Sequence, residues 1–274
     1  MLKKLLLLPL LLIVVATVGL NLWGLSHQGT HEPGSDANIN PDANRVVVVF
    51  GATGSVGDSL LKTAMAAPQV EEVHVVTRRT SPRIDAGVAS GRITLHMHSD
   101  FTDYTALEQV LRKTNTVVWG LGTTSIGMDD DTYTRIHVDF PMAFIRDWLT
   151  YAQTVPRSFH FVTGMGTDPE GDQHWAREKG RTEREMARYA MGNQLRTFSY
   201  RSGFIQPASD TINAGHTLLM WLSRPGYLAV TGEELGESML EISARVDELP
   251  NGSLIDNADT VAYAQAYQQR MNTP

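Results

Sequence analysis

The chain of 274 residues contains no cysteine. It therefore has no disulfide, no thiolate ligand for a metal and no cysteine nucleophile. It also lacks a basic stretch, and its net charge of -7 at pH 7 gives no reason to expect nucleic-acid binding. The remaining composition, 42% hydrophobic and 19% charged, is that of a globular protein with room for one α/β domain.

Charge is also missing from the N-terminal segment. No charged residue lies between Leu5 and Ser26, a run made mostly of Leu, Val and Ile. At about 20 residues this run has the length of a membrane-spanning helix, and Trp23 suits an interfacial position. The sequence therefore predicts a single-pass transmembrane anchor over residues 1–26. The alternative is a signal peptide that is removed by cleavage.

The lysines Lys3 and Lys4 precede this run, and the next basic residue after it is Arg45. The positive-inside rule then favours a folded domain outside the cytoplasm, where nicotinamide cofactors are scarce, so the side of the membrane stays open. Residues 27–44 are rich in Gly, Pro, Asn, Asp and His. They predict a flexible linker between the anchor and the domain.

From residue 45 to 274, apolar runs alternate with amphipathic segments. This alternation predicts a Rossmann-type, doubly wound parallel sheet with a small C-terminal helical lobe from about residue 204. The expected strands are 46–50, 73–77, 93–98, 116–121, 158–163 and 196–201. The expected helices are 56–67, 104–113, 131–152, 175–191, 211–222 and 259–271. A glycine-rich connection is expected between the last two helices.

A glycine-rich loop lies between the first strand and the first helix of this domain. It reads Gly51-Ala52-Thr53-Gly54-Ser55-Val56-Gly57. The first glycine allows a tight turn, the second lets the backbone approach a pyrophosphate, and the third permits close packing of helix on strand. The helix that follows directs its free N–H groups at the phosphates. The loop therefore predicts a dinucleotide site.

The end of the second strand indicates which dinucleotide binds. NAD-specific sites carry an acidic residue there for the ribose 2′-hydroxyl, whereas arginine accommodates a 2′-phosphate. This chain has Arg78 and Arg79 and no acid at that point. Guanidinium groups recognise phosphate through several donors at once. We therefore predict NADP(H) as the cofactor, the alternative being two solvated loop arginines.

Four segments occur in a characteristic order. They are the glycine loop, Thr77-Arg78-Arg79, Asp100-Phe101-Thr102-Asp103 and Gly120-Leu121-Gly122-Thr123-Thr124. In this order they resemble the atypical short-chain dehydrogenase/reductase family, in particular its branch around a mammalian NADPH-binding, tumour-suppressor-like oxidoreductase. The resemblance runs from about Val46 to Phe204. It implies that Asp100 and Phe101 lie beside the adenine and that Gly120, Leu121, Gly122 and Thr123 lie beside the nicotinamide half.

That family's chemistry uses a Tyr-x-x-x-Lys pair on one helix face, with a hydroxyl at the end of the preceding strand. The resemblance assigns Lys179 and Thr163 to the lysine and hydroxyl positions, with glycine at 164 where a second hydroxyl is common. Trp175 stands in the tyrosine position, and an indole is not an acid near neutral pH. Lys179 can still bind the nicotinamide ribose. The alternative for this segment is a salt-bridged surface helix that holds Arg177, Arg181, Arg184 and Arg188 in water.

Two functions follow from these residues. The first is an NADP(H)-dependent oxidoreductase for a small molecule, with its proton supplied by Tyr133, by His174 or by water. The second is a membrane-tethered NADP(H)-binding sensor or scaffold without turnover. No metal site is predicted, because His96 and His98 have no further ligands in register. Whether the protein is an enzyme, and for which substrate, stays open at this stage.

Overall fold

The computed structural model describes residues 2–27, 29 and 31–273, with the backbone alone for residues 2–10. In this part of the chain a seven-stranded parallel sheet has the order β3-β2-β1-β4-β5-β6-β9. Its strands are β1 (Val46–Phe50), β2 (Glu72–Thr77), β3 (Ile93–Met97), β4 (Thr116–Trp119), β5 (Arg157–Val162), β6 (Leu195–Tyr200) and β9 (Ser253–Ile255). The predicted doubly wound parallel sheet is confirmed.

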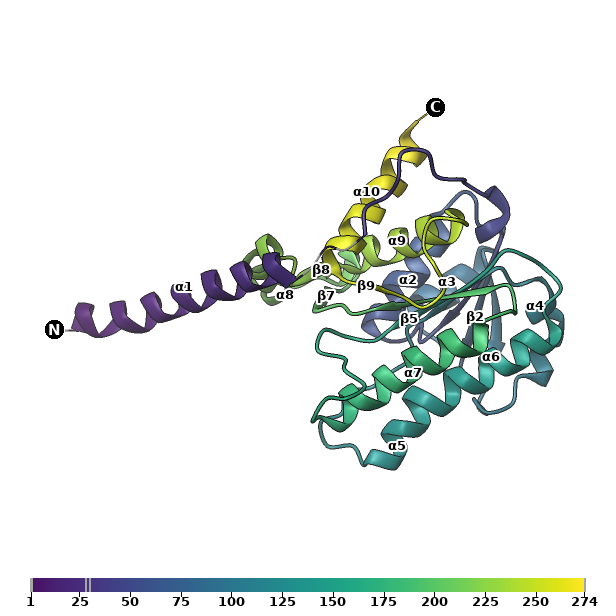
Figure 1. Ribbon diagram of the computed structural model, residues 1–274, viewed down its shortest axis with the longest axis horizontal. Helices are drawn as coiled ribbons and strands as arrows, with labels where there is room; N and C mark the ends of the chain where they lie inside the picture. The colour runs from purple at the N-terminus through teal and green to yellow at the C-terminus, as the bar shows by residue number, and fades with distance from the viewer. Residues whose placement is uncertain (1, 28, 30, 274) are drawn as a thin grey trace.

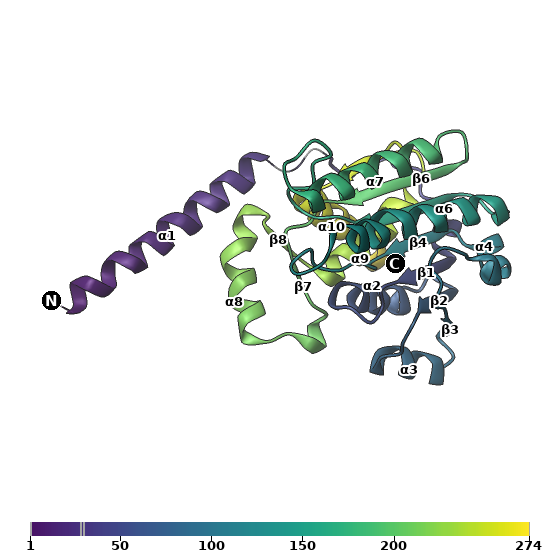
Figure 2. The same ribbon diagram turned by 90° about the horizontal axis from the view of Figure 1, so that it is seen from below.

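Helices cover both faces of this sheet (Figures 1 and 2). One face packs against α2 (Ser55–Ala66), α9 (Gly232–Ala244) and α10 (Asn257–Asn272). The other packs against α4 (Glu108–Lys113), α6 (Phe140–Tyr151) and α7 (His174–Ala190). Short elements connect them: η1 (Pro41–Asn44), α3 (Pro82–Ala89), η2 (Thr105–Leu107), α5 (Asp130–Thr134) and the π-helical turn η3 (Arg135–Asp139).

Strand β1 shows why the sheet is buried on both faces. Val47 and Val49 belong to the core beneath α2, α9 and α10. Val48 and Phe50 belong to the second core, where aromatic rings cluster. Because successive side chains of a strand point to opposite faces, a strand covered on both sides must be apolar throughout. The run of four valines and a phenylalanine meets this requirement.

The C-terminal lobe contains β7 (Phe204–Gln206), η4 (Ser209–Thr211), α8 (Ala214–Ser223), η5 (Arg224–Gly226) and β8 (Ala229–Thr231). Strands β7 and β8 form a separate two-stranded parallel sheet. The next helix, α9, occupies the region expected to be a glycine-rich connection. Its glycines permit close packing on α2: a Cβ on Gly232 would lie 2.3 Å from the side chain of Ser59, and one on Gly236 would lie 2.7 Å from that of Thr63.

Helix α1 (Leu2–His27) extends away from the domain and meets it only near its C-terminal end (Figure 1). No helix in the described residues is both long enough and apolar enough to cross a membrane. The prediction of a transmembrane anchor over residues 1–26, and with it a single-pass membrane location, is therefore wrong; residue 1 lies outside the described residues. The physical reason lies in one face of the last turns of α1, which contacts protein: Gly24 is buried, and the Asn21 side-chain amide donates to the carbonyl of Leu222 at 2.8 Å.

The segment after α1, for which the sequence predicts a linker over 27–44, lies along α9 and α10. The amide of Gly29 donates to the Asp256 carboxylate at 2.7 Å. The Arg245 guanidinium donates to the carbonyl of Gly34 at 2.8 Å. These bonds connect the described residues of the segment to the face of the domain that carries α9 and α10.

Candidate functional site

The glycine loop is held by contacts that leave no space for side chains. Gly51 has a φ of +76°, and a Cβ there would lie 2.4 Å from the carbonyl of Gly120. A Cβ on Gly57 would lie 2.1 Å from the Gly51 oxygen. The loop is thereby pressed between the end of β4 and the start of α2. Helix α2 begins at Ser55, so its first N–H groups point toward the loop, as an anion site requires.

A cavity of about 130 Å³ lies beside this loop, and we call it the arginine cavity. It is lined by Gly51, Thr53, Gly54, Val76, Thr77, Arg78, Arg79, Phe101, Gly120, Leu121 and Gly122. The Arg79 Nε donates to the Thr53 hydroxyl at 3.3 Å, and the Arg78 guanidinium lies 5.9 Å from the centre of the Phe101 ring. None of these lining residues carries a carboxylate.

A second cavity, of about 590 Å³, adjoins the first, and we call it the lysine cavity. Its walls are Gly54, Ser55, Val56, Gly120, Leu121, Gly122, Thr123, His137, Val162, Thr163, Gly164, Met165, Lys179, Ser202, Gly203 and Ile205. The two cavities share Gly54 and residues 120–122. They therefore follow one another along the carboxyl ends of β1, β4 and β5, where the order of the strands reverses and where ligands of doubly wound sheets bind.

Lys179 lies in this second cavity, on the inner face of α7. Its Nζ donates to the carbonyl oxygen of Thr163. Burial lowers the pKa of Lys179 to about 8, because a charged ammonium is disfavoured where water is excluded. The Thr163 hydroxyl is turned the other way and donates to the carbonyl of Tyr200 at 3.1 Å. Thr163 thus positions the lysine through its backbone.

Two lining residues of the lysine cavity were not identified from the sequence. The Nδ1 atom of His137 and the hydroxyl of Ser202 are both buried without a hydrogen-bond partner in the described structure. Unpaired buried polar atoms are rare unless a ligand or water satisfies them. Burial and the nearby charge of Lys179 lower the pKa of His137 to about 3, so the imidazole is neutral. His137 belongs to the π-helical turn, a feature frequent at functional sites.

The residues considered as proton donors lie elsewhere. The ring of Trp175 lies against Gly166, where an added Cβ would be 3.4 Å from its Cη2 atom. Tyr133 stacks on His137 with ring centres 4.1 Å apart, and burial raises its pKa to about 12. The Nε2 atom of His174 is 3.3 Å from the Thr134 hydroxyl. None of Trp175, Tyr133 and His174 is among the residues that line the lysine cavity.

Asp100 and its neighbour Phe101, both predicted to lie beside the adenine, differ in their position relative to the cavities. Phe101 is buried and lines the arginine cavity, whereas Asp100 is exposed and lines neither cavity. Its carboxylate accepts from the backbone amide and the hydroxyl of Thr102, and these bonds lower its pKa. Of the cofactor residues predicted from the sequence, Gly57 and Asp100 are the two that do not line a cavity wall.

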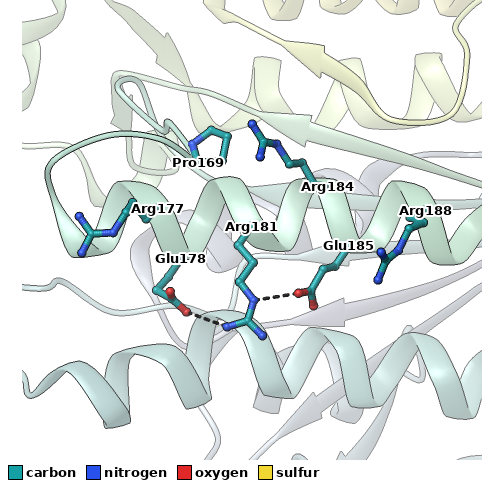
Figure 3. Close-up of a pocket in the computed structure, with 7 residues that line it drawn as sticks. All are labelled: Pro169, Arg177, Glu178, Arg181, Arg184, Glu185 and Arg188. Atoms are coloured by element: carbon teal, nitrogen blue, oxygen red, sulfur yellow. Dashed lines mark hydrogen bonds and ion pairs between the residues drawn. The ribbon is translucent and has the colours of Figure 1, made fainter.

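The outer face of α7 has a different character (Figure 3). A shallow cavity of about 580 Å³ runs along it between Pro169 and the residues Arg177, Glu178, Arg181, Arg184, Glu185 and Arg188. Arg181 pairs with Glu178 at 3.6 Å and with Glu185 at 2.8 Å. The two interpretations of this segment therefore describe opposite faces of one helix: an outer salt-bridged face in solvent, and an inner face that carries Lys179.

The histidines on the β2–β3 edge form a pair. His74 Nδ1 and His96 Nε2 are 3.0 Å apart, and His74 Nε2 is 3.0 Å from the Glu72 carboxylate. Among the described residues no group of three His, Asp or Glu side chains is arranged to hold a metal ion. The contact between His74 and His96 joins β2 to β3.

Solved structures share this architecture over most of the chain. A short-chain dehydrogenase/reductase from Saccharomyces cerevisiae superposes with a TM-score of 0.59 at 13% identity, covering 78% of this chain and 96% of its own. The chain has the fold of the short-chain dehydrogenases/reductases. A 3-oxoacyl-[acyl-carrier protein] reductase from Brucella melitensis, solved with NAD, gives 0.58 at 15% identity over 80% and 97%. A short-chain dehydrogenase family protein from Francisella tularensis gives 0.54 at 12% identity over 79% and 98%.

No protein-family profile and no curated protein sequence matches the chain. The similarity to the solved reductases is therefore one of fold. It confirms the Rossmann architecture expected from the glycine loop and the alternating strands and helices.

Proposed function

We propose that this protein binds NADP(H) along the two adjoining cavities and is an oxidoreductase of the short-chain dehydrogenase/reductase type for a small carbonyl compound. The observation that carries the proposal is the continuity of the two cavities. They share Gly54 and residues 120–122, with Arg78 and Arg79 in one and Lys179 in the other. A dinucleotide needs this arrangement, with its phosphates at the loop between its two halves.

The residues present fit such a cofactor. The loop offers backbone N–H groups at the start of α2, and its glycines at 51, 54 and 57 carry no side chain that would keep a pyrophosphate away. Arg78 and Arg79 offer guanidinium donors for a 2′-phosphate, with no carboxylate among the lining residues to repel it. At the other end, the unpaired Nδ1 of His137 and the unpaired hydroxyl of Ser202 are available to a polar ligand.

NADPH, when bound, supplies the two electrons and the hydrogen that reduce a carbonyl carbon. The protein then has to supply a proton for the carbonyl oxygen. We assign this role to Lys179, whose pKa of about 8 keeps a proton on Nζ at neutral pH and lets it leave more readily than from an ordinary lysine. The Thr163 carbonyl holds the Nζ atom in place, and the Ser202 hydroxyl can donate to the same oxygen.

Fluorescence titration with NADPH and with NADH tests the cofactor. We expect NADPH to bind at least about tenfold more tightly, because a charge-assisted bond contributes roughly 1.5–3 kcal/mol. Arg79→Gln should remove most of this preference, because it should weaken the binding of NADPH and leave the binding of NADH unchanged. Arg177→Gln, on the outer face of α7, is the matched control and should change neither affinity. Equal affinities of the wild-type protein for the two cofactors would contradict the choice of NADP(H).

Turnover is tested separately, by following NADPH oxidation with a panel of aldehydes, ketones and quinones. Wild-type protein should oxidise NADPH, and kcat/KM should fall as the pH rises through about 8, because the Lys179 ammonium is then lost. Lys179→Met should lower kcat/KM at least about a hundredfold, and the remaining activity should no longer fall as the pH rises through about 8. If the protein binds NADPH but no compound of the panel leads to NADPH oxidation, the oxidoreductase assignment is contradicted. The protein would then bind NADPH without turnover.

A further inference from the structure

A third cavity lies where helix α1 reaches the domain. It has a volume of about 300 Å³, and we call it the arm cavity. It is lined by Trp23, His27, Met165, Gly166, Arg201, Leu254, Ile255 and Asp256. Two of these residues come from α1, Leu254 and Ile255 belong to β9, and the others follow β5, β6 or β9. The helix that leaves the domain in Figure 1 thus forms one wall of a cavity at the carboxyl edge of the sheet.

The position of this wall is fixed by close backbone contacts. A Cβ on Gly24 would lie 2.1 Å from the carbonyl oxygen of Gly226, and a Cβ on Gly226 would lie 2.5 Å from the Cα of Asn21. The Asn21 amide bonds to the carbonyl of Leu222 at 2.8 Å. These contacts join α1 to η5 in one register. They determine where the side chains of Trp23 and His27 lie.

The wall that α1 contributes is flat and aromatic. The Trp23 and His27 rings stack with centres 4.9 Å apart and planes 24° apart. Trp23 is 46% exposed and lines the cavity, so its indole is accessible to a ligand. Met165 and Leu254 line the same cavity. Aromatic and apolar walls of this kind favour a flat apolar group through stacking and burial.

The two charged side chains of the arm cavity, Arg201 and Asp256, already have hydrogen-bond partners. The Arg201 guanidinium donates to both oxygens of the buried Glu183 carboxylate, at 3.2 and 2.6 Å. The Asp256 carboxylate accepts from the backbone amides of Gly29, Ala258 and Asp259. A charged ligand group would therefore have to compete with Glu183 for Arg201, or with the backbone amides at the start of α10 for Asp256. The cavity suits a neutral group.

The arm cavity adjoins the lysine cavity. Met165 lines both, and it is held by a bond from its amide to the carbonyl of Ser202 at 2.8 Å. Gly166 of the arm cavity directly follows Met165, and Arg201 of the arm cavity directly precedes Ser202 and Gly203 of the lysine cavity. A molecule whose polar end lies beside Lys179 can thus extend past Met165 toward Trp23.

We propose that the arm cavity binds the flat, uncharged aromatic portion of a carbonyl substrate and that Trp23, stacked on His27, determines this preference. The inference rests on the proposed function for the position of the carbonyl group in the lysine cavity. It gives α1 a function in substrate selection. It also narrows the substrate class to aromatic ketones or aldehydes without charge on the ring.

The full-length protein and its Trp23→Ala variant test this inference with 2-acetonaphthone and acetone as paired ketones. Leu12→Ala, an exposed position on the same helix and far from the cavity, is the matched control. Trp23→Ala should raise KM for 2-acetonaphthone about tenfold through loss of the stacked ring, with little change in kcat. KM for acetone and the Kd for NADPH should stay unchanged, as should all values for Leu12→Ala.

A second measurement does not depend on turnover. Ligand-observed NMR with 2-acetonaphthone in the presence of NADP⁺ should show binding to the wild-type protein and about tenfold weaker binding to Trp23→Ala. Gly24→Leu should separate α1 from η5, and it should therefore weaken the binding of the ketone to a similar extent. If the ketone binds in this pattern and nothing is turned over, the proposed function fails and the arm cavity stands. If wild-type protein does not bind the ketone, or Trp23→Ala binds it equally well, the inference is overturned.

Discussion

Burial lowers the pKa of four histidines in the fold, His74 among them, and the three discussed next make its stability depend on pH. Burial lowers the pKa of His96 to about 4 and that of His137 to about 3, and it lowers the pKa of His160 well below its ordinary value. In the unfolded chain each has a pKa near 6.5. Their stabilising contribution is therefore complete above pH 6.5 and is lost as the pH falls toward the folded-state values.

The magnitude follows from the proton uptake of the unfolded chain. Between pH 7.5 and pH 5, each histidine that stays neutral in the folded protein lowers the free energy of unfolding by about 2 kcal/mol, and three lower it by about 6 kcal/mol. That is comparable with the whole stability of many domains, about 5–15 kcal/mol. The carboxyls of Glu237 and Asp259, whose pKa burial raises, act in the opposite direction.

Urea unfolding followed by circular dichroism at pH 7.5, 6.5, 5.5 and 5.0 measures this loss. The variant His160→Gln separates the titration from ordinary packing. It removes bonds to the Tyr200 hydroxyl at 3.0 Å and the Ser243 hydroxyl at 2.7 Å, so it should be less stable at pH 7.5. Its loss between pH 7.5 and 5 should be about 2 kcal/mol smaller than that of the wild-type protein. An identical pH dependence of the two proteins would refute the reasoning.

Two further substitutions test the geometry of the site. Gly57→Ala should raise the Kd for NADPH at least about tenfold, because its Cβ would lie 2.1 Å from the Gly51 oxygen. Gly19→Ala is the control, since a Cβ there has no heavy atom within 4 Å, and it should leave the Kd unchanged. Fluorescence titration of both variants measures these Kd values, and a wild-type Kd in Gly57→Ala would contradict the account of the loop. Trp175→Tyr should change the rate of NADPH oxidation less than about threefold, since the ring at 175 lies against Gly166 and does not line the lysine cavity. A rise in this rate of about a hundredfold, which is typical of an added general acid, would show that the side chain at 175 enters the lysine cavity.

The strands were predictable because burial on both faces imposes a simple pattern. Each strand from β1 to β6 begins and ends within two residues of its expected bounds. Helix α9 was not predicted, because Gly232 and Gly236 look like loop residues when the chain is read alone. They are glycines because α2 packs so closely that a Cβ would meet Ser59 or Thr63. A requirement set by a partner helix about 170 residues away cannot be read from a local pattern.

The residues of the site also fall into two groups, those that a local sequence pattern predicts and those that only the fold brings to the cavity. The glycine loop, Arg79 and Lys179 belong to local motifs, and the order of those motifs along the chain is enough to predict that they share one site. His137 and Ser202 belong to no motif, and they reach the lysine cavity through a π-helical turn and through the bend after β6. A regular α-helix through residues 131–152 would point a different set of side chains at the cavity, because the extra residue of a π turn rotates those that follow it. The unpaired atoms of the two residues are visible only in the folded protein.

Helix α1 shows the limit of composition as a guide. Its apolar run satisfies the length rule for a membrane helix, yet that rule counts residues and not their partners. Asn21, Gly24 and Gly226 are the residues that matter for its position, since a polar amide and two missing Cβ atoms allow the helix to pack against η5. A side chain larger than hydrogen at Gly24 would break this contact while making the run more apolar. Gly24 therefore indicates that this turn of α1 packs against protein. Trp23, directly before it, lies on the surface that we propose faces a ligand.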